Sequence, residues 1–226
     1  YKNSEKKEFD FTYKKDKIKN VQQNNIVINC NEDFLFKDED IEISIPKKSL
    51  YTDCAFSFNK ENKQKQHTEY TILTNKIPLH KKFKLSINPD EKIIDPENLI
   101  MVQIKNKDTL FIESKWENQK IIGNLSSFGV FTLTRDTEKP KIEIIKFSYD
   151  LSNESSIKFK ISDNLSGIKE YFAEIDNEWI LMEYDSKNKL IEHHFISNPT
   201  NKKQKLYIKV SDKNGNFTEK EFYFVR

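Results

Sequence analysis

Hydrophobic and polar residues alternate along much of the chain, which is the two-residue period of a β-strand with one buried face. In "DIEISIP", Ile41, Ile43 and Ile45 share one face, and Pro46 ends the run because it has no N–H to donate. The same period recurs in "CAFSF", "KFKLSI", "GVFTLT", "SIKFKIS" and "KLYIKVS". This pattern predicts half-buried strands over most of the chain.

Clusters of turn-forming residues separate these predicted strands, as in "NPDE", "DPEN", "DNLSG" and "DKNGN". No window sustains the i, i+3, i+4, i+7 hydrophobic stripe of a long amphipathic helix. We therefore predict an all-β chain. Short strands with frequent turns favour antiparallel β-sandwiches of the immunoglobulin-like kind.

A domain boundary is predicted near residue 137. The run "TRDTEKPKIEI" is charged and turn-prone, and Pro140 lies directly before a new alternating segment. We expect a first β-sandwich over residues 30–137 and a C-terminal immunoglobulin-like β-sandwich over residues 138–226. Residues 1–29 are rich in lysine and asparagine and have weak periodicity, so we expect an arm or strand tied to an upstream domain.

Composition restricts the partners. The 226 residues include 38 basic and 36 acidic side chains, for a net charge of +2, so no large field of one sign is present to bind nucleic acid. No apolar run is long enough to span a bilayer. We expect neither a nucleic-acid partner nor a membrane span. Because the sequence starts at Tyr1 without an initiator methionine, we expect a piece of a longer or processed protein.

The two cysteines are Cys30 and Cys54. Cys54 is in phase with Phe56 and Phe58, where a strand would hold a small buried apolar residue. We favour a buried thiol at this position. A disulfide to Cys30 stays open as the alternative.

Two segments have the composition of tight turns. "SDNLSGI" holds Asp163 and Gly167, and "SDKNGNF" holds Asp212 and Gly215. Aspartate side chains accept hydrogen bonds from their own turn and glycine tolerates positive φ, so we interpret all four as structural turn residues.

The first turn should join two strands and leave Ile161 and Ile168 facing the core. The second imitates the start of a calcium loop, but an EF-hand would need glycine and glutamate where Phe217 and Tyr223 stand. A looser calcium site between neighbouring loops stays open.

No catalytic or metal-binding residue is assigned on this chain. Asp176 and Glu178 could act as a general acid and base, but their place on a predicted strand face near a turn favours solvated side chains. The histidines lack the spacing of familiar zinc sites. They are His67, His80, His193 and His194.

The segment "WILMEYD" predicts a strand with apolar groups on both faces. Trp179 lies on one face and Tyr184 on the other. We favour a buried Trp179, as in many immunoglobulin-like sandwiches. The alternative is an exposed aromatic interface, for which Trp179, Tyr184 and Trp116 are the candidates.

The segments "SDNLSGIKEYFAEIDNEWILMEYDSKNKLIEHHF" and "LYIKVSDKNGNFTEKEFYFVR" resemble the C-terminal β-domain of the lysostaphin-type murein endopeptidases, cell-envelope zinc metallopeptidases of Bacteroidetes-type bacteria. Upstream, "ISIPKKSLYTDCAFSF", "IPLHKKFKLSI" and "NLSSFGVFTLTRDTEKPKI" resemble the β-domain that precedes it in that family. The family's H-x-x-x-D and H-x-H zinc motifs have no counterpart here. No catalytic residue can therefore be carried over.

The resemblance implies that the chain is the non-catalytic region of a peptidoglycan metallopeptidase, in the cell envelope and periplasmic. Zinc is then expected only in the parent's catalytic domain, with no cofactor on this chain. The expected partners are that upstream domain and peptidoglycan or another envelope protein. Two alternatives stay open: a stand-alone β-sandwich module that binds glycan or protein, and an independent enzyme without a recognisable motif.

Overall fold

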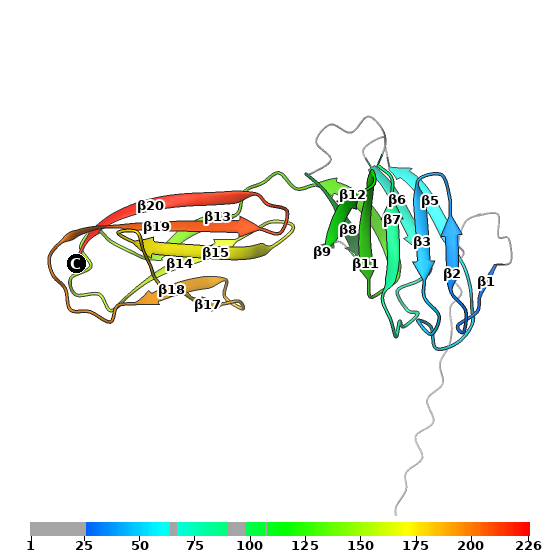
Figure 1. Cartoon of the computed structure of the whole chain (residues 1–226), viewed down its shortest axis with the longest axis horizontal. Coiled ribbons are helices and arrows are strands. Elements are labelled where there is room, and N and C mark those ends of the chain that lie inside the picture. The colour runs from blue at the N-terminus through cyan, green and yellow to red at the C-terminus, as the bar shows by residue number, and fades with distance from the viewer. Residues whose placement is uncertain (1–25, 64–66, 90–97, 107) are drawn as a thin grey trace, which may run out of the picture.

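The computed structural model describes residues 26–63, 67–89, 98–106 and 108–226. Its regular structure is built from β-strands arranged in two sandwiches that follow one another along the chain (Figure 1). Within these residues, no helix has the length and apolarity that crossing a bilayer demands. Residues 1–25 of the arm predicted over residues 1–29 lie outside the described residues.

The first sandwich contains twelve strands in the described residues. They are β1 (Val27–Ile28), β2 (Phe34–Lys37), β3 (Ile41–Ile45), β4 (Cys54–Ala55), β5 (Phe58–Lys63), β6 (His67–Ile72), β7 (Phe83–Ile87), β8 (Leu99–Lys105), β9 (Asp108–Ile112), β10 (Ser114–Glu117), β11 (Lys120–Leu125) and β12 (Gly129–Arg135).

Two antiparallel sheets face each other in this domain. One has the strand order β10-β11-β7-β3-β2 and the other β5-β6-β12-β8-β9. The alternation seen in the sequence becomes the inner face: Ile41, Ile43 and Ile45 of β3 are all buried. Phe83 and Phe128 are fully buried in the core of this domain and pack with ring centroids 4.8 Å apart.

The N-terminal boundary predicted at residue 30 is wrong by one strand. β1 pairs with β4, and Ile28 is buried in the core of the first sandwich. Residues 26–29 therefore belong to this domain and not to an arm. Cys30 and Cys54 are both free thiols that pack against the same core, so no disulfide joins them.

The second sandwich contains eight strands. They are β13 (Lys141–Lys146), β14 (Ser156–Ser162), β15 (Ile168–Ile175), β16 (Glu178–Trp179), β17 (Glu183–Asp185), β18 (Leu190–His194), β19 (Lys203–Asp212) and β20 (Phe217–Val225). Their inner faces form a hydrophobic cluster of their own around Phe159, Ile208 and Phe224.

The two sheets of this domain run β13-β14-β18-β17 and β16-β15-β19-β20. Taken in chain order, this is the A-B-E-D and C-F-G arrangement of an immunoglobulin constant-type sandwich, with β16 added beside the third strand. The all-β, two-sandwich prediction is thereby confirmed.

The buried position predicted for Trp179 is wrong, because 65% of this residue is exposed. The segment "WILMEYD" is not one strand: β16 ends at Trp179 and belongs to one sheet, whereas β17 starts at Glu183 and belongs to the other. Between them the chain crosses the edge of the sandwich. Met182 then supplies the buried side chain, at 2% exposure.

Candidate functional site at the domain junction

Strand topology brings three separate segments to one end of the second sandwich. β13 starts where the antiparallel β14 ends, since Lys141 pairs with Ser162. β15 begins and β19 ends at the same place, since Ile168 pairs with Asp212. The interdomain linker, the β14–β15 loop and the β19–β20 loop therefore meet at the end that faces the first sandwich (Figure 1).

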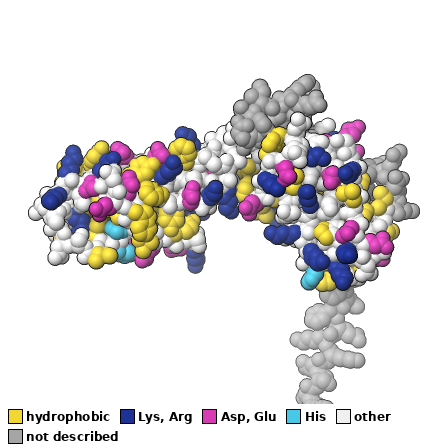
Figure 2. All heavy atoms as spheres, viewed as in Figure 1, with side chains coloured by type: hydrophobic (Ala, Val, Ile, Leu, Met, Phe, Trp, Pro, Cys, Tyr) yellow, Lys and Arg dark blue, Asp and Glu magenta, His cyan; other side chains and the backbone are white. Residues whose placement is uncertain are grey.

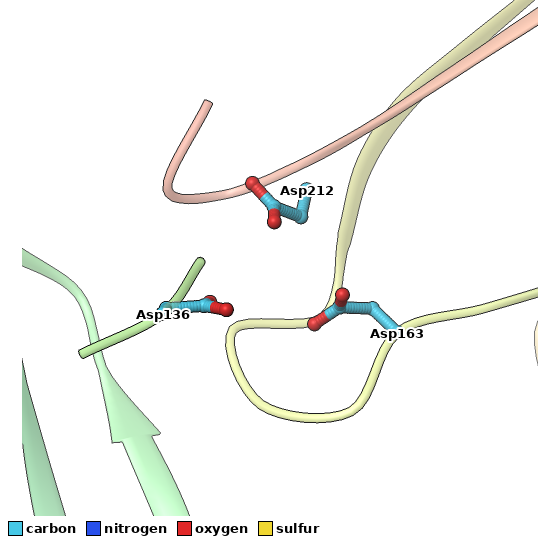
Figure 3. A group of neighbouring side chains, drawn as sticks. All are labelled: Asp136, Asp163 and Asp212. Carbon is cyan, nitrogen blue, oxygen red and sulfur yellow. The ribbon is translucent and has the colours of Figure 1, made fainter. Parts of the chain in front are cut away.

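Each of these three segments supplies one aspartate. Asp136 directly follows β12, Asp163 lies in the β14–β15 loop, and Asp212 ends β19. One carboxylate oxygen from each lies within 4.8 Å of the others. Figure 3 shows the three carboxylates pointing toward a common centre.

Asp136 joins the two domains through its backbone. Its N–H donates to the carbonyl oxygen of Asn98 in the first sandwich, at 2.9 Å. Its own carbonyl oxygen accepts hydrogen bonds from the side-chain amides of Asn214 and Asn216 in the second, at 2.8 and 3.0 Å. The residue is therefore fixed from both sides.

Asp163 is held by its own loop. Its Oδ2 accepts hydrogen bonds from the backbone N–H groups of Leu165 and Gly167, at 3.0 and 2.8 Å. Gly167 has φ of +82°, a conformation that glycine adopts without strain. The loop thus uses one oxygen of Asp163 and leaves Oδ1 buried with no hydrogen-bond partner.

Asp212 is held in the same manner by the β19–β20 loop. Its Oδ1 accepts from the N–H groups of Asn214 and Asn216, at 2.9 and 2.8 Å, and its Oδ2 accepts from the Asn216 amide at 2.8 Å. Gly215 in this loop has φ of +97°. A hydrogen bond from the N–H of Lys213 to the carbonyl of Gly167, at 3.1 Å, ties the two loops together.

The carboxylate of Asp136 has no such support. The residue is 1% exposed, and neither of its side-chain oxygens has a hydrogen-bond partner. Ser166 lies close enough to favour the charged form, but its buried hydroxyl makes no hydrogen bond of ordinary geometry. Burial raises the pKa of Asp136, Ser166 opposes the rise, and the nearby carboxylates of Asp163 and Asp212 add to it.

The arrangement is a small, oxygen-lined and negatively charged site. Among the described residues, no lysine or histidine forms an ion pair with these three carboxylates. Groups of carboxylates that converge on one point without an electrophilic or nucleophilic neighbour suit cation binding.

The aromatic candidates are exposed and lie in two places. Trp116 is on β10 of the first sandwich, 43% exposed, whereas Trp179 and Tyr184 belong to the second. Tyr184 packs on Tyr171, with ring centroids 5.6 Å apart. Tyr171, Trp179 and Leu181 line a hollow of about 190 Å³. Figure 2 shows hydrophobic side chains gathered on this domain.

The remaining acidic and histidine candidates do not converge. The Asp176 carboxylate accepts from the backbone N–H of Lys205 at 2.8 Å, and Glu178 is exposed on an edge strand. His193 contacts the carbonyl oxygen of Leu181 at 2.9 Å, and His67 contacts Glu69 at 3.3 Å. Each of these contacts joins a candidate residue to one nearby group, and none brings two of the candidates together.

Sequence reasoning identified Asp163 and Asp212 as turn residues but missed Asp136. It stands in a charged linker, where an aspartate is unremarkable. The available signal was the immunoglobulin-like topology itself, which places the start of the A strand (β13) beside the loops that follow the B strand (β14) and the F strand (β19).

Comparison with known families gives one match. Residues 25–136 match the family model of the Zu5-like domain. The first sandwich is thus similar to that domain, and the match ends at Asp136, the residue that enters the junction. A search of curated proteins gave no match to the chain.

Proposed function

We propose that this chain is the non-catalytic, two-domain region of a cell-envelope peptidoglycan metallopeptidase, and that it positions or shields an adjoining zinc peptidase domain. The likeness of the quoted segments to the β-domains of lysostaphin-type murein endopeptidases supports this assignment. Zinc and the groups that activate water would then belong to the adjoining domain, in the envelope compartment where peptidoglycan lies.

The observation that carries the proposal is the fixed junction. A region that positions another domain must transmit orientation from one end to the other. The Asp136 N–H donates to Asn98 of the first sandwich, and its carbonyl oxygen accepts from the side-chain amides of Asn214 and Asn216 of the second. Thr218 of β20 also donates to the carbonyl oxygen of Pro140 in the linker. Such a joint suits a spacer of set geometry better than a flexible tether.

Cleavage of cross-linked muropeptides tests the proposal. The chain by itself should release no new amine termini, whereas the protein extended upstream should release them when zinc is supplied. Inserting a flexible Gly-Ser segment between Thr137 and Pro140 of the extended protein should change its activity on intact peptidoglycan more than on small muropeptides. Zinc-dependent cleavage by residues 1–226 alone would contradict the assignment.

A second candidate function rests on the exposed aromatic patch of Trp179, Leu181 and Tyr184. Exposed aromatic side chains beside a hollow are typical of surfaces that bind glycans or proteins. If the chain is a binding module, Trp179→Ala should abolish its co-sedimentation with peptidoglycan, and Trp116→Ala on the other domain is the matched control. Equal co-sedimentation of both variants and the unmodified chain would exclude this surface.

A further inference from the structure

We propose that Asp136, Asp163 and Asp212 bind one calcium ion, which joins the two β-sandwiches at their junction. The site needs only the residues of the junction, so it can exist whatever domain adjoins the chain. Three carboxylates from three separate segments come within 4.8 Å of one another there. A calcium ion with ligands at about 2.3–2.6 Å spans a group of this size.

A second, independent observation that indicates a bound cation is the missing hydrogen-bond partner of the buried Asp136 carboxylate. Both of its oxygens are buried and lack hydrogen-bond partners, and Asp163 Oδ1 is in the same state. A buried carboxylate without a partner is costly, and folded proteins normally pair it or bind a metal with it. Figure 3 shows the carboxylates of Asp136 and Asp163 pointing toward each other, with the Asp212 carboxylate beside them.

The backbone of each loop holds the carboxylate of its aspartate in place. Asp163 and Asp212 each receive two backbone N–H bonds on one oxygen, so the second oxygen of each is fixed in direction. The hydroxyl of Ser166 is buried without a partner and can add a further oxygen. Because these protein oxygens are oriented before the ion binds, binding costs less conformational entropy.

The donor set selects calcium over other common cations. It contains oxygen and no thiolate or imidazole, which disfavours zinc. Magnesium retains several waters and demands a near-octahedral shell, whereas calcium accepts irregular shells of six to eight oxygens. Asp136 and Asp212 are almost completely buried, so protein oxygens must supply a large part of the shell.

The ion would act on the joint between the domains. Asp136 is bonded through its backbone to the first sandwich, whereas Asp163 and Asp212 are loop residues of the second. An ion that holds all three carboxylates links the domains directly. Calcium should therefore narrow the range of interdomain angles as well as stabilise the fold.

Calcium titration of the metal-free chain tests the proposal. Isothermal calorimetry should give one ion per chain with a Kd of about 0.1 mM or lower. Calcium at about 100-fold above Kd should raise the unfolding temperature by about 5 °C or more. Small-angle scattering should show a narrower distribution of overall dimensions with calcium than with EDTA.

Asp136→Asn is the decisive variant, because the Asp136 carboxylate accepts no hydrogen bond whose loss could unfold the protein. It should lower calcium affinity by about 100-fold or more, since it removes one charge and one oxygen from the shell. In EDTA it should unfold at the same temperature as the unmodified chain or higher, because a buried charge is gone.

Asp185→Asn is the matched control. Asp185 accepts the same kinds of hydrogen bond as Asp212, but in an exposed turn of the same domain, at 3.0 Å from the N–H of Lys187 and 3.2 Å from that of Asn188. This variant should bind calcium like the unmodified chain. The proposal is overturned if the unmodified chain binds no calcium at about 5 mM, if Asp136→Asn binds it equally well, or if magnesium or zinc binds more tightly. If the three carboxylates share a proton in place of a cation, the unmodified chain would bind no calcium.

Discussion

Two aspartate turns in the second sandwich have nearly the same local chemistry and very different surroundings. Asp212 accepts hydrogen bonds from the N–H groups of Asn214 and Asn216 and from the Asn216 amide. Asp185 accepts them from the N–H groups of Lys187 and Asn188 and from the Asn188 amide. Asp212 is fully buried, whereas Asp185 lies in solvent at the β17–β18 turn.

The difference shows that the turn motif is not itself the site. The hydrogen bonds of Asn188 lower the pKa of Asp185, so that turn holds a solvated carboxylate by local bonds alone. The Asp212 turn makes comparable bonds, but Asp136 and Asp163 come beside it. An aspartate that accepts hydrogen bonds from its own turn is common. It becomes part of a candidate cation site here because two further segments bring their carboxylates beside it.

The largest expected contrast between the turns is in stability. Asp212→Ala leaves the partly buried N–H groups of Asn214 and Asn216 without an acceptor and removes a calcium ligand, so it should cost about 3 kcal/mol of unfolding free energy in calcium. Asp185→Ala should cost much less, because Asp185 is exposed and water replaces the lost bonds. Urea unfolding of the two variants measures the difference. Equal losses would show that burial at the junction adds nothing.

A smaller effect is expected at the glycine of the Asp163 loop. Gly167 has φ of +82° and no heavy atom within 4 Å of an added Cβ, so a substitution meets backbone strain without a steric clash. Gly167→Val should destabilise by about 1–2 kcal/mol. An unchanged unfolding midpoint would show that the loop relaxes at no cost.

The smallest effect is expected in the turn that follows Asp185. Lys189 has φ of +59°, which a non-glycine residue can adopt at modest cost. Lys189→Gly should therefore change stability by less than about 0.5 kcal/mol, since relief of strain and loss of chain entropy offset each other. A gain above about 1 kcal/mol would mean that the positive φ of Lys189 stores more backbone strain than expected.

The sequence predicted those features that depend on neighbours along the chain. The two-residue period located β3, β14 and β19, and Asp163 and Gly167 do lie in the turn between β14 and β15. Ile161 is fully buried, and Ile168 packs against the same core. Each of these depends on one strand and the turn beside it.

Features that depend on distant segments were missed. The convergence of Asp136 with Asp212 requires that two loops and the linker reach one end of the sandwich, and no local pattern encodes this. Trp179 was misplaced for a similar reason. Its segment alternates like a strand, but the chain leaves one sheet after β16 and joins the other at β17, so alternation no longer reports which side is buried.

The position of the cation can be measured directly by crystallography of the chain grown with calcium and recorded with anomalous scattering. The account predicts one peak between Asp136, Asp163 and Asp212, with oxygen from each at about 2.3–2.6 Å. Two results would contradict it: no peak at this position in saturating calcium, or an Asp136 carboxylate turned away into solvent.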